Sequence, residues 1–103
     1  MAALAGAYVY ILQCADGGYY TGLTQRTPDE RESEHNQGLD PAAWTFQRRP
    51  VRVVWSEHFD RIDEAIATER RIKGWSRIKK EALIRRDYER LPALASRKGR
   101  APG

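Results

Sequence analysis

The sequence contains one cysteine and no long apolar run, and these shortages narrow the classes of protein to which it can belong. A lone thiol, Cys14, cannot form a disulfide within the chain or supply a cysteine-based zinc site. No apolar stretch approaches the ~18 residues that span a bilayer, and residues 1–7 are too short and uncharged for a signal peptide. These absences predict a cytoplasmic protein, or one of another reducing compartment, without a membrane partner.

Length and composition predict one small folded domain. The 103 residues leave room for a single modest core, and 41% hydrophobic residues is a globular rather than a disordered composition. We expect the domain to occupy residues 1–92 and a basic, disordered tail to follow over residues 93–103. The formal net charge of +4 favours a polyanionic partner such as nucleic acid, although many basic proteins bind none.

Residues 8–24 predict a β-hairpin around which the rest of the chain is organised. A three-residue loop of residues 16–18, with a glycine in the left-handed conformation, would place Tyr10 and Tyr20 on the same face of the hairpin. A two-residue loop would put them on opposite faces. On one face, the two tyrosines either pack a core or stand beside Gly22 as part of a site.

Residues 28–37 predict a helix that is polar along almost its whole length. Thr27 is a good N-cap and Gly38 a good stop signal. Arg31 and His35 lie four residues apart, so they project from the same side of the helix. They either face a polar site on the hairpin or belong to a short, solvated surface helix.

Residues 39–50 predict a loop that mixes aromatic and basic side chains. Trp44, Arg48 and Arg49 can grip phosphates and stack on bases, or can anchor the loop to the core. Residues 51–57 then predict a third strand, whose odd-numbered residues share one face. This strand gives the hairpin the partner that it needs for stability.

The next helix carries the main anomaly of the sequence. It begins at a cap formed by Asp60 or Asp63, ends near Lys73, and has an apolar stripe at helical spacing. Glu69 lies on this stripe, where a carboxylate is costly unless it is paired or bound to a cation. It is therefore either a metal ligand or the partner of a nearby arginine such as Arg31.

A last helix is predicted over residues 77–90, with Ser76 as its N-cap. Its inward face would hold Ile78, Ala82 and Leu83. Its other faces are rich in positive charge, which forms either a solvated surface or one that follows phosphates. The basic residues that we assign to nucleic-acid binding here are Lys73, Lys79 and Lys80.

Four short segments follow one another along the chain. They are Tyr8-Val9-Tyr10, Tyr20-Thr21-Gly22, Arg31-Glu-Ser-Glu-His35-Asn36 and Glu69-Arg-Arg-Ile72-Lys73-Gly-Trp75. In this order they resemble the motifs of the GIY-YIG nucleases, and in particular of the small stand-alone bacterial members. The first glycine and both central isoleucines of the paired motif are replaced. The resemblance covers residues 8–84.

The resemblance implies a fold and a reaction. The fold is a single α+β domain in which a small three-stranded antiparallel sheet is flanked by helices, in the order ββαβαα. The reaction is hydrolysis of DNA phosphodiester bonds with one divalent cation, Mg²⁺ or Mn²⁺. The cation would be held by Glu69, with water completing its shell.

The resemblance also implies a role for each matching residue. Arg31 would stabilise the charge that builds on the phosphate. Tyr10 and Tyr20 would position or deprotonate the attacking water, with Tyr10 slightly preferred as the base. His35 would assist proton transfer or hold a tyrosine, and Gly22 would permit close approach of a backbone.

Two departures shape the expected substrate. Leu23 stands where some members carry a lysine, and the chain has no attached DNA-recognition domain. We therefore expect selection of structure rather than sequence, with flap, branched, damaged or single-stranded DNA as substrates in repair or recombination and RNA left open. The alternatives are a non-catalytic nucleic-acid-binding module with the same fold, and a protein-interaction domain whose site residues form only a buried polar network.

Overall fold

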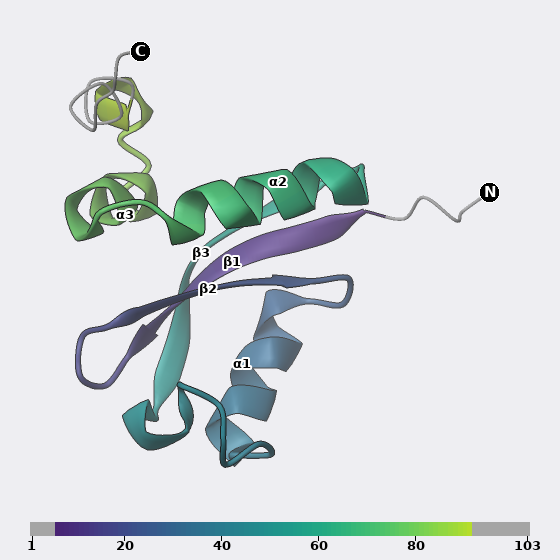
Figure 1. Cartoon of the computed structure of the whole chain (residues 1–103), viewed down its shortest axis with the longest axis vertical. Coiled ribbons are helices and arrows are strands. Elements are labelled where there is room, and N and C mark those ends of the chain that lie inside the picture. The colour runs from purple at the N-terminus through teal and green to yellow at the C-terminus, as the bar shows by residue number, and fades with distance from the viewer. Residues whose placement is uncertain (1–5, 92–103) are drawn as a thin grey trace. The chain divides into compact units, whose positions relative to one another are not determined.

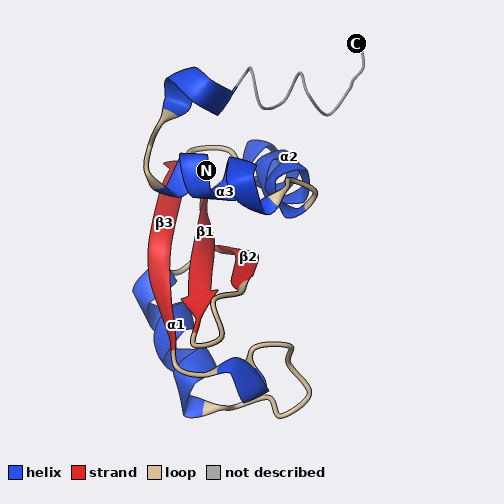
Figure 2. Ribbon diagram, turned by 90° about the vertical axis from the view of Figure 1, so that its left-hand side faces the viewer, coloured by secondary structure: helices blue, strands red, loops and turns tan. Residues whose placement is uncertain are grey.

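The computed structural model describes residues 6–91, in the expected order ββαβαα (Figure 1). The elements are β1 (Ala7–Cys14), β2 (Tyr19–Thr24), α1 (Pro28–Gln37), the 3₁₀ turn η2 (Phe46–Arg48), β3 (Val51–Phe59), α2 (Ile62–Lys73), α3 (Arg77–Ile84) and the 3₁₀ turn η3 (Tyr88–Arg90). The strands form an antiparallel sheet in the order β2-β1-β3, which confirms the predicted α+β fold (Figure 2).

Contacts divide the chain into two compact units, Met1–Lys73 and Gly74–Gly103. The sheet, α1 and α2 belong to the first unit, and α3 and η3 belong to the second. The tail predicted over residues 93–103 lies outside the described residues. The assignment of residues 1–92 to one domain remains a prediction.

The hairpin brings the two tyrosines to one face, which is the alternative that a three-residue loop predicts. Tyr10 pairs with Gly22 and Leu12 pairs with Tyr20 across the two strands. The loop begins one residue earlier than expected, because the left-handed glycine is Gly17, with φ 88°. A shift of one residue at both ends of the loop moves the register by two, so the faces of the side chains are unchanged.

Strand β3 departs from simple alternation. Ile11 pairs with Trp55 but Leu12 pairs with Val53, so a β-bulge leaves Val54 without a direct partner. The bulge puts Val53 on the face of Leu12 and Trp55 on the opposite face. The prediction that the odd-numbered residues of this strand share one face is therefore wrong beyond Val53.

Helix α1 has the predicted bounds. The Thr27 hydroxyl accepts a hydrogen bond from the Glu30 backbone N–H, and Gly38 ends the helix with φ 69°. The helix packs with polar side chains. Asn36 donates to the Val51 carbonyl at 2.9 Å and accepts from the Val51 N–H at 2.7 Å, and Glu32 accepts from the Val53 N–H at 2.8 Å.

Helix α2 supplies the apolar cover of β1 and β2. Its Ala65 and Ile72 are almost fully buried, as are Val9 and Ile11 on β1. In the view of Figure 1, α2 and α1 lie on opposite sides of the strands. The helix begins at Ile62, so neither proposed aspartate caps it in the way that the sequence suggests.

The second unit begins as predicted and then differs. The Ser76 hydroxyl caps α3 by accepting from the Lys79 N–H at 3.2 Å. The helix ends at Ile84, because the backbone turns at Arg86 into the left-handed region, with φ 60°. Ile78 is 56% exposed while Lys79 is buried, so the predicted inward position of Ile78 is wrong.

The sequence predicts that the chain has no internal disulfide and no membrane span. Cys14 is a free, buried thiol. Between residues 6 and 91, no helix has the length and apolar character needed to cross a membrane.

Candidate active site

Tyr10 and Tyr20 lie side by side on the face of the sheet that α1 covers. Their ring centroids are 6.4 Å apart. Tyr10 is 1% exposed, whereas Tyr20 is half-buried. A Cβ atom on Gly22 would lie 2.5 Å from the Tyr10 hydroxyl oxygen, so the missing side chain makes room for Tyr10. The space beside Gly22 is filled by this ring and not left open to a ligand.

Arg31 projects from α1 toward the tyrosines. Its guanidinium lies beside the Tyr10 hydroxyl, and its Nη1 lies 2.8 Å from Glu34 Oε1. Glu34 also pairs with Arg26, so one carboxylate joins two guanidinium groups. Burial raises the pKa of Tyr10, and the Arg31 guanidinium opposes that shift. Because the pKa of Tyr10 is raised overall, its phenol holds its proton more tightly, which does not favour Tyr10 as a base in the protein alone.

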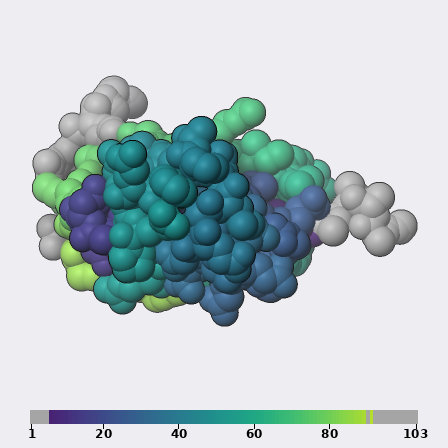
Figure 3. Space-filling model, turned by 90° about the horizontal axis from the view of Figure 1, so that it is seen from below, coloured from purple at the N-terminus to yellow at the C-terminus, as the bar shows by residue number. Residues whose placement is uncertain are grey.

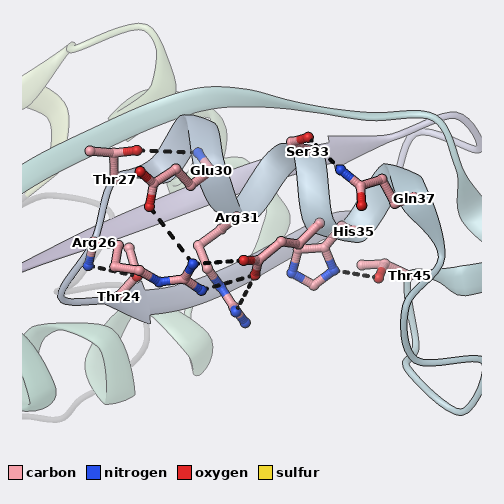
Figure 4. Close-up of polar contacts among 10 residues, drawn as sticks. Thr24, Arg26, Thr27, Glu30, Arg31, Ser33, His35, Gln37 and Thr45 are labelled. Carbon is pink, nitrogen blue, oxygen red and sulfur yellow. Dashed lines mark hydrogen bonds and ion pairs between the residues drawn. The ribbon is translucent and has the colours of Figure 1, made fainter.

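His35 lies one turn after Arg31 and contacts Tyr20. Their ring centroids are 5.2 Å apart, and His35 Nδ1 lies 2.7 Å from the Thr45 hydroxyl oxygen (Figure 4). Burial, reinforced by the charge of Arg31, lowers the pKa of His35. The imidazole is therefore neutral near pH 7 and able to take up a proton. Its Nε2 is buried and has no hydrogen-bond partner among residues 6–91.

A cavity of about 210 Å³ opens beside these side chains. Tyr20, Arg31 and His35 form part of its wall, and residues 38–46 supply much of the remainder. Seen from below, α1 and the segment after it, in blue to teal, occupy much of the molecular surface (Figure 3). A substrate group in this cavity would therefore contact three of the residues predicted to take part in catalysis.

Glu69 forms an ion pair with Lys73. The Glu69 side chain is 14% exposed and its carboxylate pairs with Lys73 at 2.8 Å, which differs from the expected arginine partner. Glu69 raises the pKa of Lys73, and Tyr20 and Tyr10 add smaller effects in the same direction. Lys73 is therefore within electrostatic reach of both phenols.

The described residues offer one way to hold a cation. Between residues 6 and 91, no group of three or more His, Cys, Asp or Glu side chains is arranged as a metal site. Mg²⁺ does not need such a cage, because it commonly binds one or two carboxylates and keeps waters and phosphate oxygens as its other ligands. The nearly buried carboxylate of Glu69 fits this mode of binding.

The arginines assigned to nucleic-acid binding have internal contacts. Arg48 donates to the Trp44 carbonyl at 2.8 Å and lies over the Trp44 ring. Arg49 donates to the Phe46 carbonyl at 2.7 Å and lies over the Phe46 ring. Both arginines thus help to fold the segment between α1 and β3.

The two lysines of α3 belong to the second unit. Lys79 is 6% exposed, and its ammonium lies 4.0 Å from the centre of the Trp75 ring. Burial lowers the pKa of Lys80. The structure therefore does not support Lys79 as an exposed phosphate contact.

Sequence reasoning missed two residues that support the site. Glu34 pairs with Arg31 from three positions along the same helix, and this spacing is a recognisable signal. Thr45 is 1% exposed and contacts His35 across a loop, and no local pattern in the sequence identifies such a contact.

Comparisons with known proteins point to one family. A family model described as the GIY-YIG catalytic domain matches residues 6–82. The chain is 47% identical to a UPF0213 protein of Halobacterium salinarum over 75% of this chain and 97% of that protein. It is 40% identical to one of Listeria monocytogenes over 86% of this chain and 98% of that protein.

A solved structure agrees with these matches. The solution NMR structure of a UPF0213 protein from Bacillus halodurans has a TM-score of 0.50 and 42% sequence identity. The similarity covers 77% of this chain and 82% of that one. The names of these relatives state no activity.

Proposed function

Because this chain belongs to the GIY-YIG family, we propose that it is a metal-dependent endonuclease that hydrolyses DNA phosphodiester bonds. The observation that carries the proposal is the convergence of Tyr20, Arg31 and His35 on one cavity, with Tyr10 behind them. A phosphate held there would meet a guanidinium, a phenol and a neutral imidazole together. These are the groups that stabilise charge, orient water and accept a proton.

In the proposed reaction, a water oxygen bonds to phosphorus and the ester bond to the leaving oxygen breaks. Arg31 binds the phosphate through the N–H groups that do not bond to Glu34. Tyr20 orients the attacking water, because it borders the cavity and Tyr10 does not. The proton from the water passes to His35 Nδ1 through the Thr45 hydroxyl, which lies 2.7 Å from that nitrogen and also borders the cavity, and the leaving oxygen gains a proton from solvent.

We assign the metal to Glu69, as Mg²⁺ or Mn²⁺. A bound divalent cation would supply positive charge that neutralises the phosphate and makes a water more acidic. Lys73 must leave the Glu69 carboxylate for this to occur, and its side chain is 56% exposed and able to move. The role of Tyr10 is then to position the Arg31 guanidinium.

The substrate and setting remain part of the proposal. We propose flap, branched or single-stranded DNA as substrates, a role in repair or recombination, and a cytoplasmic location. The reason is that the family model over residues 6–82 describes a catalytic domain, and contacts to phosphate carry no sequence information. RNA of the same structures is a second substrate to test.

A cleavage assay tests the proposal. End-labelled linear, flap, branched and single-stranded DNA are incubated with the wild type, Glu69→Gln and Glu64→Gln, in Mg²⁺, in Mn²⁺ and in EDTA. Glu64 is an exposed carboxylate on the same helix, so it is a matched control. We expect metal-dependent products from the wild type and Glu64→Gln, and a loss of at least about a hundredfold for Glu69→Gln. Equal cleavage by all three proteins would contradict the assigned metal ligand.

The second candidate is a nucleic-acid-binding module without catalysis. The ion pair between Lys73 and Glu69 favours it, because the ammonium neutralises the carboxylate that would hold the cation. This candidate predicts salt-sensitive DNA binding and no cleavage with any divalent ion. Cleavage that depends on Glu69 would exclude it.

A further inference from the structure

The cavity beside the proposed reaction centre is larger than phosphate binding requires. Its volume is about 210 Å³, and Tyr20, Arg31 and His35 form only part of its wall. The remainder includes Leu39, Asp40, Ala43 and Phe46, which come from the segment after α1. A cavity below the ~300 Å³ of a typical small-molecule site has room for one compact group.

The part of the cavity wall that includes Leu39, Asp40, Ala43 and Phe46, together with the neighbouring Tyr20 ring, suits a nucleobase better than a phosphate. Phe46 and Tyr20 offer aromatic rings, and Leu39 and Ala43 are apolar. Asp40 adds a carboxylate to this part of the wall, which repels an anion. Among residues 6–91, Glu34 is paired with Arg26 and Arg31, while the Asp40 carboxylate accepts one hydrogen bond, from the Ala42 N–H. Asp40 can therefore accept from an amino group on a base.

We propose that this cavity is a base-binding pocket, which holds one unpaired base of the nucleotide next to the scissile phosphate. The inference rests on the proposed function, because Arg31 is the phosphate contact that brings the nucleotide to the cavity. A base within a duplex stack cannot enter a pocket of this size without being turned out of the helix, which costs free energy. DNA with an unpaired base at the cleavage position is therefore the preferred substrate.

The first test is a binding measurement that requires no cleavage. Fluorescence anisotropy is measured with Glu69→Gln, in EDTA, on flap DNA whose junction fixes the register. A single abasic site is moved through the unpaired nucleotides next to the junction. We expect one position at which loss of the base weakens binding about tenfold, as for loss of one base-stacking contact. Equal affinities at every position would overturn the inference.

The second test fills the pocket. Ala43 lines the cavity and Ala42 is exposed and outside it, so Ala43→Leu and Ala42→Leu are a matched pair. In the Glu69→Gln background, Ala43→Leu should weaken binding of intact flap DNA about tenfold and abolish the effect of the abasic site. Ala42→Leu should change neither. An abasic effect that persists in Ala43→Leu would locate the base elsewhere.

The two proposals fail separately. If the wild type cuts no DNA with any metal but the abasic effect is present and depends on Ala43, the nuclease proposal fails and the pocket stands. If the wild type cuts DNA but the abasic scan is flat, the pocket fails and the nuclease stands. The abasic scan uses no pocket variant, so it gives a result even if Ala43→Leu does not fold.

Discussion

At the residue level, the missing side chain of Gly22 explains how Tyr10 lies against the hairpin. The Tyr10 ring occupies the position that a Cβ on Gly22 would need. Tyr10 in turn lies beside the Arg31 guanidinium, so a change at Gly22 would reach that guanidinium through Tyr10. Gly22 thus acts on the site indirectly, because it allows the Tyr10 side chain to lie beside Arg31.

Gly22→Ala should destabilise the protein by about 1–3 kcal/mol, because the new methyl group overpacks the Tyr10 ring. The free energy of unfolding is measured in urea. Removing the clash should remove the cost, so in a Tyr10→Leu background the same substitution should cost less than about 0.5 kcal/mol. Equal costs in both backgrounds would mean that the Tyr10 ring is not the obstacle.

Lys73→Met should make the protein bind Mn²⁺ more tightly, by about two- to fivefold, because it removes an ammonium that competes for Glu69. Mn²⁺ titration followed by electron paramagnetic resonance gives the dissociation constant. Arg70→Met, at an exposed position of the same helix, is the control and should leave the constant unchanged. Unchanged affinity in Lys73→Met would show that the ion pair does not oppose the cation.

At the level of elements, α1 shows how a polar helix can pack. It places hydrogen-bonding side chains, and not an apolar stripe, against β3. Asn36 satisfies both backbone groups of Val51, which is 3% exposed. A buried N–H and C=O without partners would be costly, so this amide contributes to folding.

Asn36→Ala should lower the free energy of unfolding by about 1–3 kcal/mol, because both groups of Val51 lose their partner. Gln37→Ala is the matched control. Gln37 is exposed and, within the described part of the chain, its side chain bonds only to Ser33 on its own helix, so its loss should cost less than about 0.5 kcal/mol. The free energy of unfolding of the two variants is measured in urea. Equal losses of stability would contradict a stabilising role for the bonds from Asn36 to Val51.

The sequence predicts those elements whose ends have local signals. Thr27 and Gly38 mark α1 because caps depend on neighbouring residues. The bulge at Val54 has no such signal, because it arises in the pairing of β3 with a distant strand. The end of α3 has none either, because it depends on the left-handed backbone of Arg86, a conformation that arginine rarely adopts. The same limit applies to the site.

Within the candidate site, the resemblance to the family motifs groups Tyr10, Tyr20, Arg31 and His35 before the structure is known. A three-residue hairpin loop then predicts that the two tyrosines share a face. The sequence also identifies Glu69 as an anomaly, because a carboxylate on an apolar stripe needs a partner. The expected partner is an arginine such as Arg31, whereas the partner is Lys73, which stands four positions after Glu69 on the same helix, a spacing at which opposite charges pair.

At the level of the whole molecule, His35 links protonation to stability. Its pKa is lowered in the folded protein by burial and by Arg31, with Glu34 opposing. The unfolded chain, with its ordinary value of 6.5, therefore binds the proton more readily. This contribution to stability is present above pH 6.5 and is lost as the pH falls through the lowered pKa of the folded state.

Urea unfolding from pH 8 to pH 5 should show a fall in stability below pH 6.5 that is smaller in His35→Asn. The difference between the two curves isolates this histidine from other titrating groups. Parallel curves over the whole range would mean that burial does not perturb His35.

The polar contacts between α1 and β3 also affect whether two copies of the protein can associate through their sheets. In the sheet order β2-β1-β3, β3 is an edge strand, and edge strands invite pairing with another chain. Glu32 and Asn36 already bond the backbone groups of Val53 and Val51. A second strand cannot hydrogen-bond there without displacing the helix. This half of the edge is thereby protected against strand addition and the aggregation that follows from it.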